Sequence, residues 1–161
     1  MTRIGILSDT HIPKAATELP PAVYREFRGV DMILHAGDLV EAEVLKKLGT
    51  LAPTHAVCGN MDMPDLKKSL PEKKIIRVEG YKIGLFHGYG PPGRIVNIVA
   101  GEFNNVDAIV FGHSHNPLCR EIDKTLFFNP GSPTDKIFSP YNSLGMLEVS
   151  EKGIRGRIIK I

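Results

Sequence analysis

One junction recurs along the chain, in which a short apolar run ends abruptly in glycine and polar residues. It occurs six times, as RIGIL into SDTH, DMILH into AGD, THAV into CGNMD, KIGLF into HGYG, AIVF into GHSH, and LFF into NPGS. Apolar runs of this length are typical of buried strands, and the polar residues mark the loops that follow them. We therefore expect an α/β fold whose polar clusters share one rim, because ligand sites of α/β sheets lie beyond the carboxyl ends of strands.

Helical patterns separate the first three apolar runs, over residues 21–27 and 41–48, and another helix is predicted over 94–102. This order predicts a βαβαβ start with parallel pairing. Three hairpins are predicted in the second half, over residues 73–86, 118–129 and 143–161. The pattern indicates two packed sheets that mix parallel and antiparallel strands, with helices outside.

Length and composition limit the class of protein. The 161 residues suit a single domain, 1–161, and the net charge of +2, from 20 basic and 18 acidic side chains, does not indicate nucleic-acid binding. Cys58 and Cys119 fit neither a zinc motif nor a disulfide framework, so we expect packed, reduced thiols. The first residues lack the apolar length of a signal peptide or a membrane span, which predicts a cytoplasmic protein without a membrane partner.

The polar clusters carry seven oxygen or nitrogen donors and no sulfur donor: Asp9, His11, Asp38, Asn60, His87, His113 and His115. Each motif alone has an ordinary explanation as a helix cap, a turn or a hydrogen-bonded histidine. Together they exceed what one ion takes from a protein, but they divide well between two ions that share a carboxylate. Mixed imidazole and carboxylate donors suit manganese, iron, zinc, nickel or cobalt, so the set favours a binuclear transition-metal centre.

The motifs resemble those of the calcineurin-like metallophosphoesterase superfamily, in the same order along the chain. They are D-x-H at Asp9 and His11, G-D at Asp38, G-N at Asn60, H-G at His87, and G-H-x-H at His113 and His115. The short chain, the GNMD variant and the late NPGS segment resemble the small single-domain bacterial and archaeal branch of this superfamily. The resemblance implies a four-layer α-β-β-α sandwich with the metal site at the carboxyl ends of the strands.

The resemblance also implies residue roles. The first ion would be held by Asp9, His11 and His115, the second by Asn60, His87 and His113, and Asp38 would bridge them. Two divalent transition-metal ions, manganese foremost, would generate a bridging hydroxide that attacks phosphorus in line. Asp38, Asn60 and His87 are expected to be the catalytic residues, and the implied substrate is a small phosphate ester.

One position departs from the superfamily pattern. Many larger members carry a histidine after G-N as a candidate acid for the leaving oxygen, whereas this chain has Met61, whose thioether cannot donate a proton. We therefore expect phosphodiesters with good leaving groups to be preferred, with a phosphomonoesterase or nucleotide phosphatase as the alternative. A non-catalytic scaffold, like the membrane-coat subunit of this fold, is disfavoured because all seven ligand positions are filled.

The remaining candidates have weaker patterns. Asp62 either orients a ligand or closes a turn, and these two roles stay open. His35 is expected to bond backbone near the site, and His55 has no assigned role. Arg94 is expected to be an exposed helix residue rather than a phosphate ligand. Pairing of hairpin edges into a homo-oligomer also stays open.

Overall fold

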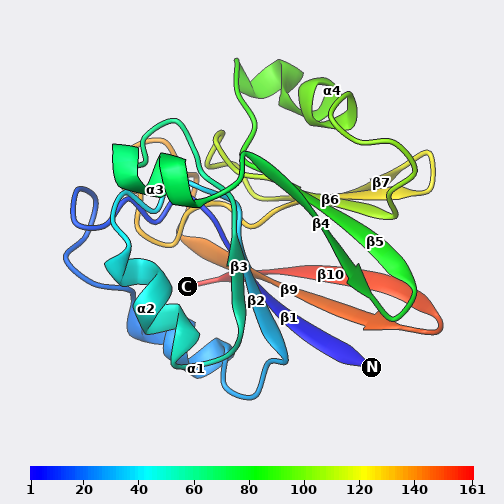
Figure 1. Cartoon of the computed structure of the whole chain (residues 1–161), viewed down its shortest axis with the longest axis horizontal. Coiled ribbons are helices and arrows are strands. Elements are labelled where there is room, and N and C mark those ends of the chain that lie inside the picture. Colours follow the sequence, from blue (N-terminus) through cyan, green and yellow to red (C-terminus); the bar gives the residue numbers. More distant parts are fainter.

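The computed structural model describes residues 1–161 and forms two five-stranded sheets with helices on their outer faces (Figure 1). The elements in chain order are β1 (Thr2–Leu7), α1 (Pro21–Glu26), β2 (Met32–His35), α2 (Glu43–Gly49), β3 (Thr54–Ala56), α3 (Pro64–Ser69), β4 (Lys73–Val78), β5 (Tyr81–Phe86), the 3₁₀ turn η1 (Pro92–Arg94), α4 (Ile95–Ala100), β6 (Ala108–Val110), β7 (Leu118–Ile122), β8 (Thr125–Asn129), β9 (Ser143–Ser150) and β10 (Gly153–Lys160).

Both sheets mix parallel and antiparallel strands. The first has the order β10-β9-β1-β2-β3, in which β1, β2 and β3 are parallel and the β9–β10 hairpin is antiparallel. The second has the order β4-β5-β6-β8-β7, in which β5, β6 and β8 are parallel and the two edge strands run antiparallel. The predicted βαβαβ start and all three predicted hairpins are confirmed.

Three apolar clusters fill the interfaces between four layers. The cluster between the two sheets includes Ile4, Ile6, Leu85 and Val110. A second lies between the first sheet and helices α1 and α2, and a third lies between the second sheet and α4. Figure 1 shows α4 on one outer face and α1 and α2 on the opposite one. The expected α-β-β-α sandwich is therefore confirmed.

The alternation of side chains along β1 explains how the first sheet meets its helices. Ile4 and Ile6 point into the inter-sheet cluster, so Gly5 faces the helix layer. A Cβ atom at Gly5 would lie 2.9 Å from the ring of Phe27, which is fully buried. The missing side chain lets Phe27 pack directly on the backbone of the strand.

The helices differ from prediction in two places. The sequence did not indicate α3. Only Leu66 is buried among its six residues, so together with Lys67 and Lys68 there is no apolar repeat of helical spacing to recognise. The helix predicted over 94–102 is divided into η1 and α4 and ends at Ala100. None of the helices has the length and apolar character needed to cross a bilayer.

Candidate metal centre

The seven predicted donors lie together at one end of the sandwich, in loops that follow the carboxyl ends of strands from both sheets. The first sheet contributes four, after β1, β2 and β3, and the second contributes three, after β5 and β6: Asp9, His11, Asp38 and Asn60 from the first, His87, His113 and His115 from the second. The carboxyl ends of neighbouring parallel strands meet at one edge, so the predicted common rim is present.

Five of these residues have a left-handed backbone. The φ angles are 54° at Asp9, 43° at His11, 57° at Asp38, 66° at His113 and 58° at His115. This region costs an L-residue roughly 1–2 kcal/mol, and such strain gathers at functional sites where the surrounding structure holds it. The loops are therefore shaped for the positions of their side chains rather than for local backbone preference.

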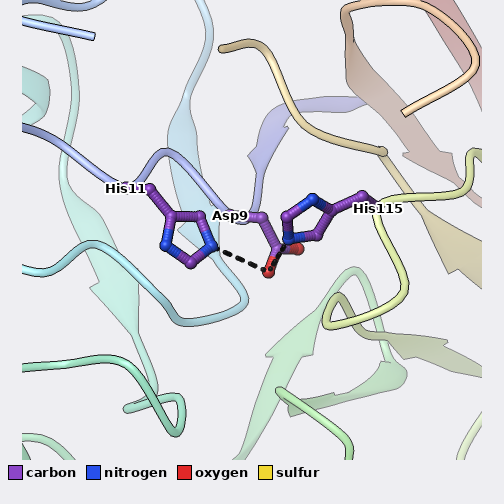
Figure 2. Close-up of side chains that lie close together, drawn as sticks. All are labelled: Asp9, His11 and His115. Atoms are coloured by element: carbon purple, nitrogen blue, oxygen red, sulfur yellow. Dashed lines mark ion pairs between the residues drawn. The ribbon is translucent and has the colours of Figure 1, made fainter. Parts of the chain in front are cut away.

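The Asp9 carboxylate is the centre of one group of donors (Figure 2). Its Oδ1 lies 3.3 Å from Nε2 of His115, 3.7 Å from Nε2 of His11 and 4.0 Å from Nε2 of His87. Asp9 has no exposed surface. Asp9, His11 and His115 thus form one group whose donor atoms are close enough together to hold a metal ion.

A second group forms around His87. Its Nε2 lies 3.2 Å from Oδ2 of Asp38 and 3.1 Å from Oδ1 of Asn60. The Asn60 oxygen also lies 3.3 Å from Nδ1 of His113. Oδ2 of Asp38 reaches the first group as well, because it lies 3.5 Å from Nε2 of His11. Asp38 therefore stands between the two groups.

Three of the histidines are oriented by an acceptor on the far side of the ring. Nδ1 of His87 donates to the carbonyl oxygen of Ala36 at 2.7 Å, and Nε2 of His113 donates to that of Gly90 at 3.1 Å. Nδ1 of His115 lies 2.5 Å from the Asp135 carboxylate. Each bond leaves the other ring nitrogen directed at the site, which is the arrangement that metal-binding histidines require.

Two buried donor atoms have no hydrogen-bond partner at all: Oδ1 of Asp9 and Nε2 of His11. Leaving a buried polar atom unpaired costs roughly 1–3 kcal/mol, and more for a charged one, so such atoms call for an explanation. A divalent ion between them would satisfy both. The residues present therefore fit a metal ion on the evidence of their own geometry.

The electrostatics of the two carboxylates agree with a cation site. Burial by itself would raise the pKa of Asp9, but the imidazoles of His11 and His115 hold it well below its usual range. Burial likewise opposes protonation of His87, yet Asp38 and Asp9 raise its pKa to about 9, and Asp9 with Asp135 does the same for His115. Without metal, protons on His87 and His115 compensate the buried carboxylates.

Asp62 connects the loop after β3 to the loop after β2. Its carboxylate accepts backbone N–H bonds from Gly59 at 2.7 Å, Val40 at 2.7 Å and Asp38 at 3.2 Å. Its carboxylate forms no hydrogen bond with the side chain of any of the seven predicted metal ligands. The bonds of Asp62 fit both roles that the sequence left open: it closes the turn at Gly59, and it separately holds the backbone of Asp38.

The sequence interpretation missed Asp135, which follows the NPGS segment. Besides His115, its carboxylate binds the backbone N–H groups of Ile137, Phe138 and Ser139. In the same segment the Ser132 hydroxyl donates to the carbonyl of Asp9 at 2.7 Å. The available signal was the row of Ser, Thr and Asp after the sixth strand junction, a composition that favours side-chain bonds to backbone.

The other candidates lie outside the donor groups. His35 is buried, accepts the Gly37 N–H at Nδ1 and has its pKa lowered to about 3 by burial, so its expected backbone bond is confirmed. His55 lies 3.2 Å from Lys74, and Arg94 is exposed, as expected. The packed thiol expected at Cys119 is wrong: this side chain is exposed on the edge strand β7, while Cys58 is half-buried.

A cavity of about 630 Å³ opens over the donor groups. Its wall includes side chains of both groups, among them His11, Asp38, Asn60, His113 and His115. This volume lies within the range of about 300–1,000 Å³ that is typical of small-molecule sites. The donors are therefore accessible to a small ligand.

Comparison with known proteins agrees with the motif resemblance. The family profile described as "Calcineurin-like phosphoesterase superfamily domain" matches residues 2–152. The chain belongs to the calcineurin-like phosphoesterase superfamily. Within the superfamily it is 41% identical, over 137 residues, to a "Probable metallophosphoesterase" of Methanothermobacter thermautotrophicus, covering 81% of this chain and 77% of that protein. The predicted archaeal and bacterial branch is thereby confirmed.

Two further comparisons concern a named relative and the fold. Phosphodiesterase MJ0936 of Methanocaldococcus jannaschii is 25% identical over 170 residues, covering 98% of this chain and 99% of that protein. The structure of Vacuolar Protein Sorting 29 from Cryptosporidium parvum aligns with a TM-score of 0.77 at 20% identity, over 99% of this chain and 97% of the other. The second likeness shows a shared fold.

Proposed function

We propose that this protein is a metal-dependent hydrolase of phosphate esters that prefers phosphodiesters. The observation that carries the proposal is the pair of buried, unpartnered donor atoms, Oδ1 of Asp9 and Nε2 of His11, within a group that is close enough together to hold a metal ion. Membership of the superfamily and the similarity to a named phosphodiesterase support the reaction class. A single domain, a cytoplasmic location and a small phosphate-ester substrate complete the proposal.

The proposed ligands are divided between two divalent ions, manganese foremost. Asp9, His11 and His115 would hold the first, and a second set, Asn60, His87 and His113, would hold the other. Asp38 would bridge them, because its Oδ2 lies 3.5 Å from Nε2 of His11 and 3.2 Å from Nε2 of His87. His115 lies beside Asp9, whereas His113 lies beside Asn60, and this difference supports the division.

When bound, the ions would lower the pKa of a water molecule and neutralise charge on the phosphate oxygens. The protein's own contribution is to fix the donors. Oδ1 of Asp38 accepts the Met61 N–H at 2.8 Å, which leaves Oδ2 directed at the histidines. Asn60 presents its amide oxygen to His87 and His113. Asp38, Asn60 and His87 are accordingly proposed as the catalytic residues.

The preference for phosphodiesters follows from the residue after Asn60. Met61 lines the cavity with a thioether, which cannot protonate a leaving oxygen. Esters whose leaving group needs no proton should then react best. Hydrolysis of an aryl phosphodiester and of the matching aryl monoester, each with added manganese, tests this. Faster monoester hydrolysis would favour the phosphomonoesterase alternative.

The Asp38→Asn variant tests the proposed site itself. It keeps the size of the side chain but removes the charge that two ions would share, so it should lose most of the activity and bind less metal. Asp107→Asn is a matched control, because the Asp107 carboxylate binds the backbone N–H of Lys82 outside the donor groups. Full activity of Asp38→Asn would contradict the bridging role. Absence of both activity and bound metal in the wild-type protein would favour a scaffold role, which the fold shared with Vacuolar Protein Sorting 29 allows.

A further inference from the structure

Three large apolar side chains stand exposed at the wall of the metal-site cavity. The exposed fractions are 43% for Met61, 81% for Ile137 and 75% for Phe138, and all three line the cavity. They come from two loops that are far apart in sequence, one after β3 and one after β8. Exposed apolar groups that converge on one cavity mark a binding surface, because covering them releases about 25 cal/mol per Å².

This apolar rim, Met61, Ile137 and Phe138, is held in place from within the protein. The Asp135 carboxylate accepts the backbone N–H of Ile137 at 2.8 Å and that of Phe138 at 3.1 Å. The Phe138 ring also meets the ring of His115 edge to face, with 6.3 Å between centroids. A surface that is already ordered loses little conformational entropy when a ligand covers it.

The charge of the cavity wall limits the kind of substituent that can bind there. Lys14 is the one lysine in the wall, which holds no arginine. A second phosphate group would therefore find a single cation beyond the metal site, whereas an apolar group would find the whole apolar rim. Phe138 lies beside His115, so the apolar rim is within reach of the substituent of a phosphate ester bound at the donors.

We propose that the apolar rim is a subsite for an aromatic substituent of the phosphate ester, so that esters of aromatic groups are preferred over sugar phosphates and polyphosphates. The inference rests on the proposed function, because it assumes that phosphate binds at the donor groups. It identifies Ile137 and Phe138 as specificity-determining residues. Neither side chain belongs to the proposed metal ligands.

The test compares two phosphonates that differ in one substituent and that the enzyme cannot hydrolyse. Phenylphosphonate and methylphosphonate are titrated into manganese-loaded protein by calorimetry. Wild-type protein should bind phenylphosphonate roughly 10-fold more tightly, because burying part of an aromatic ring contributes about 1.5 kcal/mol. The Ile137→Ala/Phe138→Ala variant should bind the two within about 2-fold, with its affinity for methylphosphonate unchanged. Ile75→Ala, at a residue that is 47% exposed on β4, is the matched control.

The outcomes separate this inference from the proposed function. Equal affinity of wild-type protein for both phosphonates, or a phenyl preference that survives the double substitution, overturns the apolar subsite while phosphate binding stands. Failure of both compounds to bind overturns the proposed function itself. Sedimentation of the same proteins provides a last check: a dimer that the double variant converts to monomer, with the phenyl preference intact, would make the rim an interface between copies.

Discussion

The Asp135 carboxylate lies 2.5 Å from Nδ1 of His115, while Nε2 of the same ring lies 3.3 Å from Oδ1 of Asp9. A carboxylate in this position fixes both the tautomer and the orientation of a histidine and strengthens it as a metal ligand. The same carboxylate holds the loop that carries Phe138. Asp135 is thus a positioning residue for both His115 and the loop that carries Phe138.

Asp135→Asn should weaken metal binding by about 10–100-fold, because the amide no longer offers His115 a charged acceptor. The measurement is calorimetric titration of manganese or zinc into the metal-free variant. Asp107→Asn should bind metal as the wild-type protein does, since Asp107 holds only the backbone at β5. Unchanged metal affinity in the Asp135→Asn variant would show that Asp135 does not position His115 for metal binding.

His113→Ala and His115→Ala should each lose a different ion. His113 lies beside Asn60 and His87, whereas His115 lies beside Asp9 and His11. Metal content measured by mass spectrometry should fall from two ions to about one in each variant. Distinguishing the remaining site by the spectrum of bound cobalt gives the identity of the ion that is lost. Identical cobalt spectra for the two variants would refute the division.

Gly112→Ala should disturb the site without changing a donor. A Cβ atom at Gly112 would collide with Oγ of Ser8 and would lie 2.6 Å from Oδ2 of Asp9, so there is no room for a side chain at this position. Such overpacking costs about 1–3 kcal/mol, so thermal unfolding and metal affinity should both decline. Gly49→Ala, in open space at the end of α2, should leave metal affinity unchanged and should raise stability slightly, because alanine favours the helix over glycine by about 0.5–1 kcal/mol. A Gly112 variant with wild-type stability would show that Ser8 and Asp9 move freely.

Removal of metal should lower the melting temperature. An ion at 100 times its dissociation constant stabilises the folded state by about 2.7 kcal/mol. At roughly 2–4 °C per kcal/mol for a chain of this size, the shift between chelated and manganese-loaded protein should be about 5–10 °C. Scanning calorimetry measures it, and Asp38→Asn should show a smaller shift. Equal melting temperatures with chelator and with manganese would argue against a bound ion.

The positions of the donors could be predicted because they follow strand ends. Runs such as RIGIL and KIGLF have the length and composition of buried strands, and the polar residue after each run must lie at the rim. Parallel pairing of β1 with β2 and of β5 with β6 then brings Asp9, Asp38, His87 and His113 to one end. For this part of the fold the local pattern and the topology agree.

What could not be predicted depends on contacts between distant segments. Asp135 is 20 residues from His115 and reaches it only because the loop after β8 folds back over the loop after β6. The left-handed backbone of His113 and His115 could not be predicted, because only a few per cent of non-glycine residues adopt that region. The spacing of Cys119, which fits neither a zinc motif nor a disulfide framework, predicts a packed thiol, but β7 is an edge strand whose central residues are exposed.

The placement of the donors on two sheets has a mechanical consequence. Asp9 and Asp38 follow strands of one sheet, whereas His87 and His115 follow strands of the other. Each proposed ion would take ligands from both sheets and would join them by coordinate bonds at one end of the sandwich. Opening that end and releasing the ion would then be a single event, so amide exchange in the loops after β1 and β6 would report the lifetime of the bound metal.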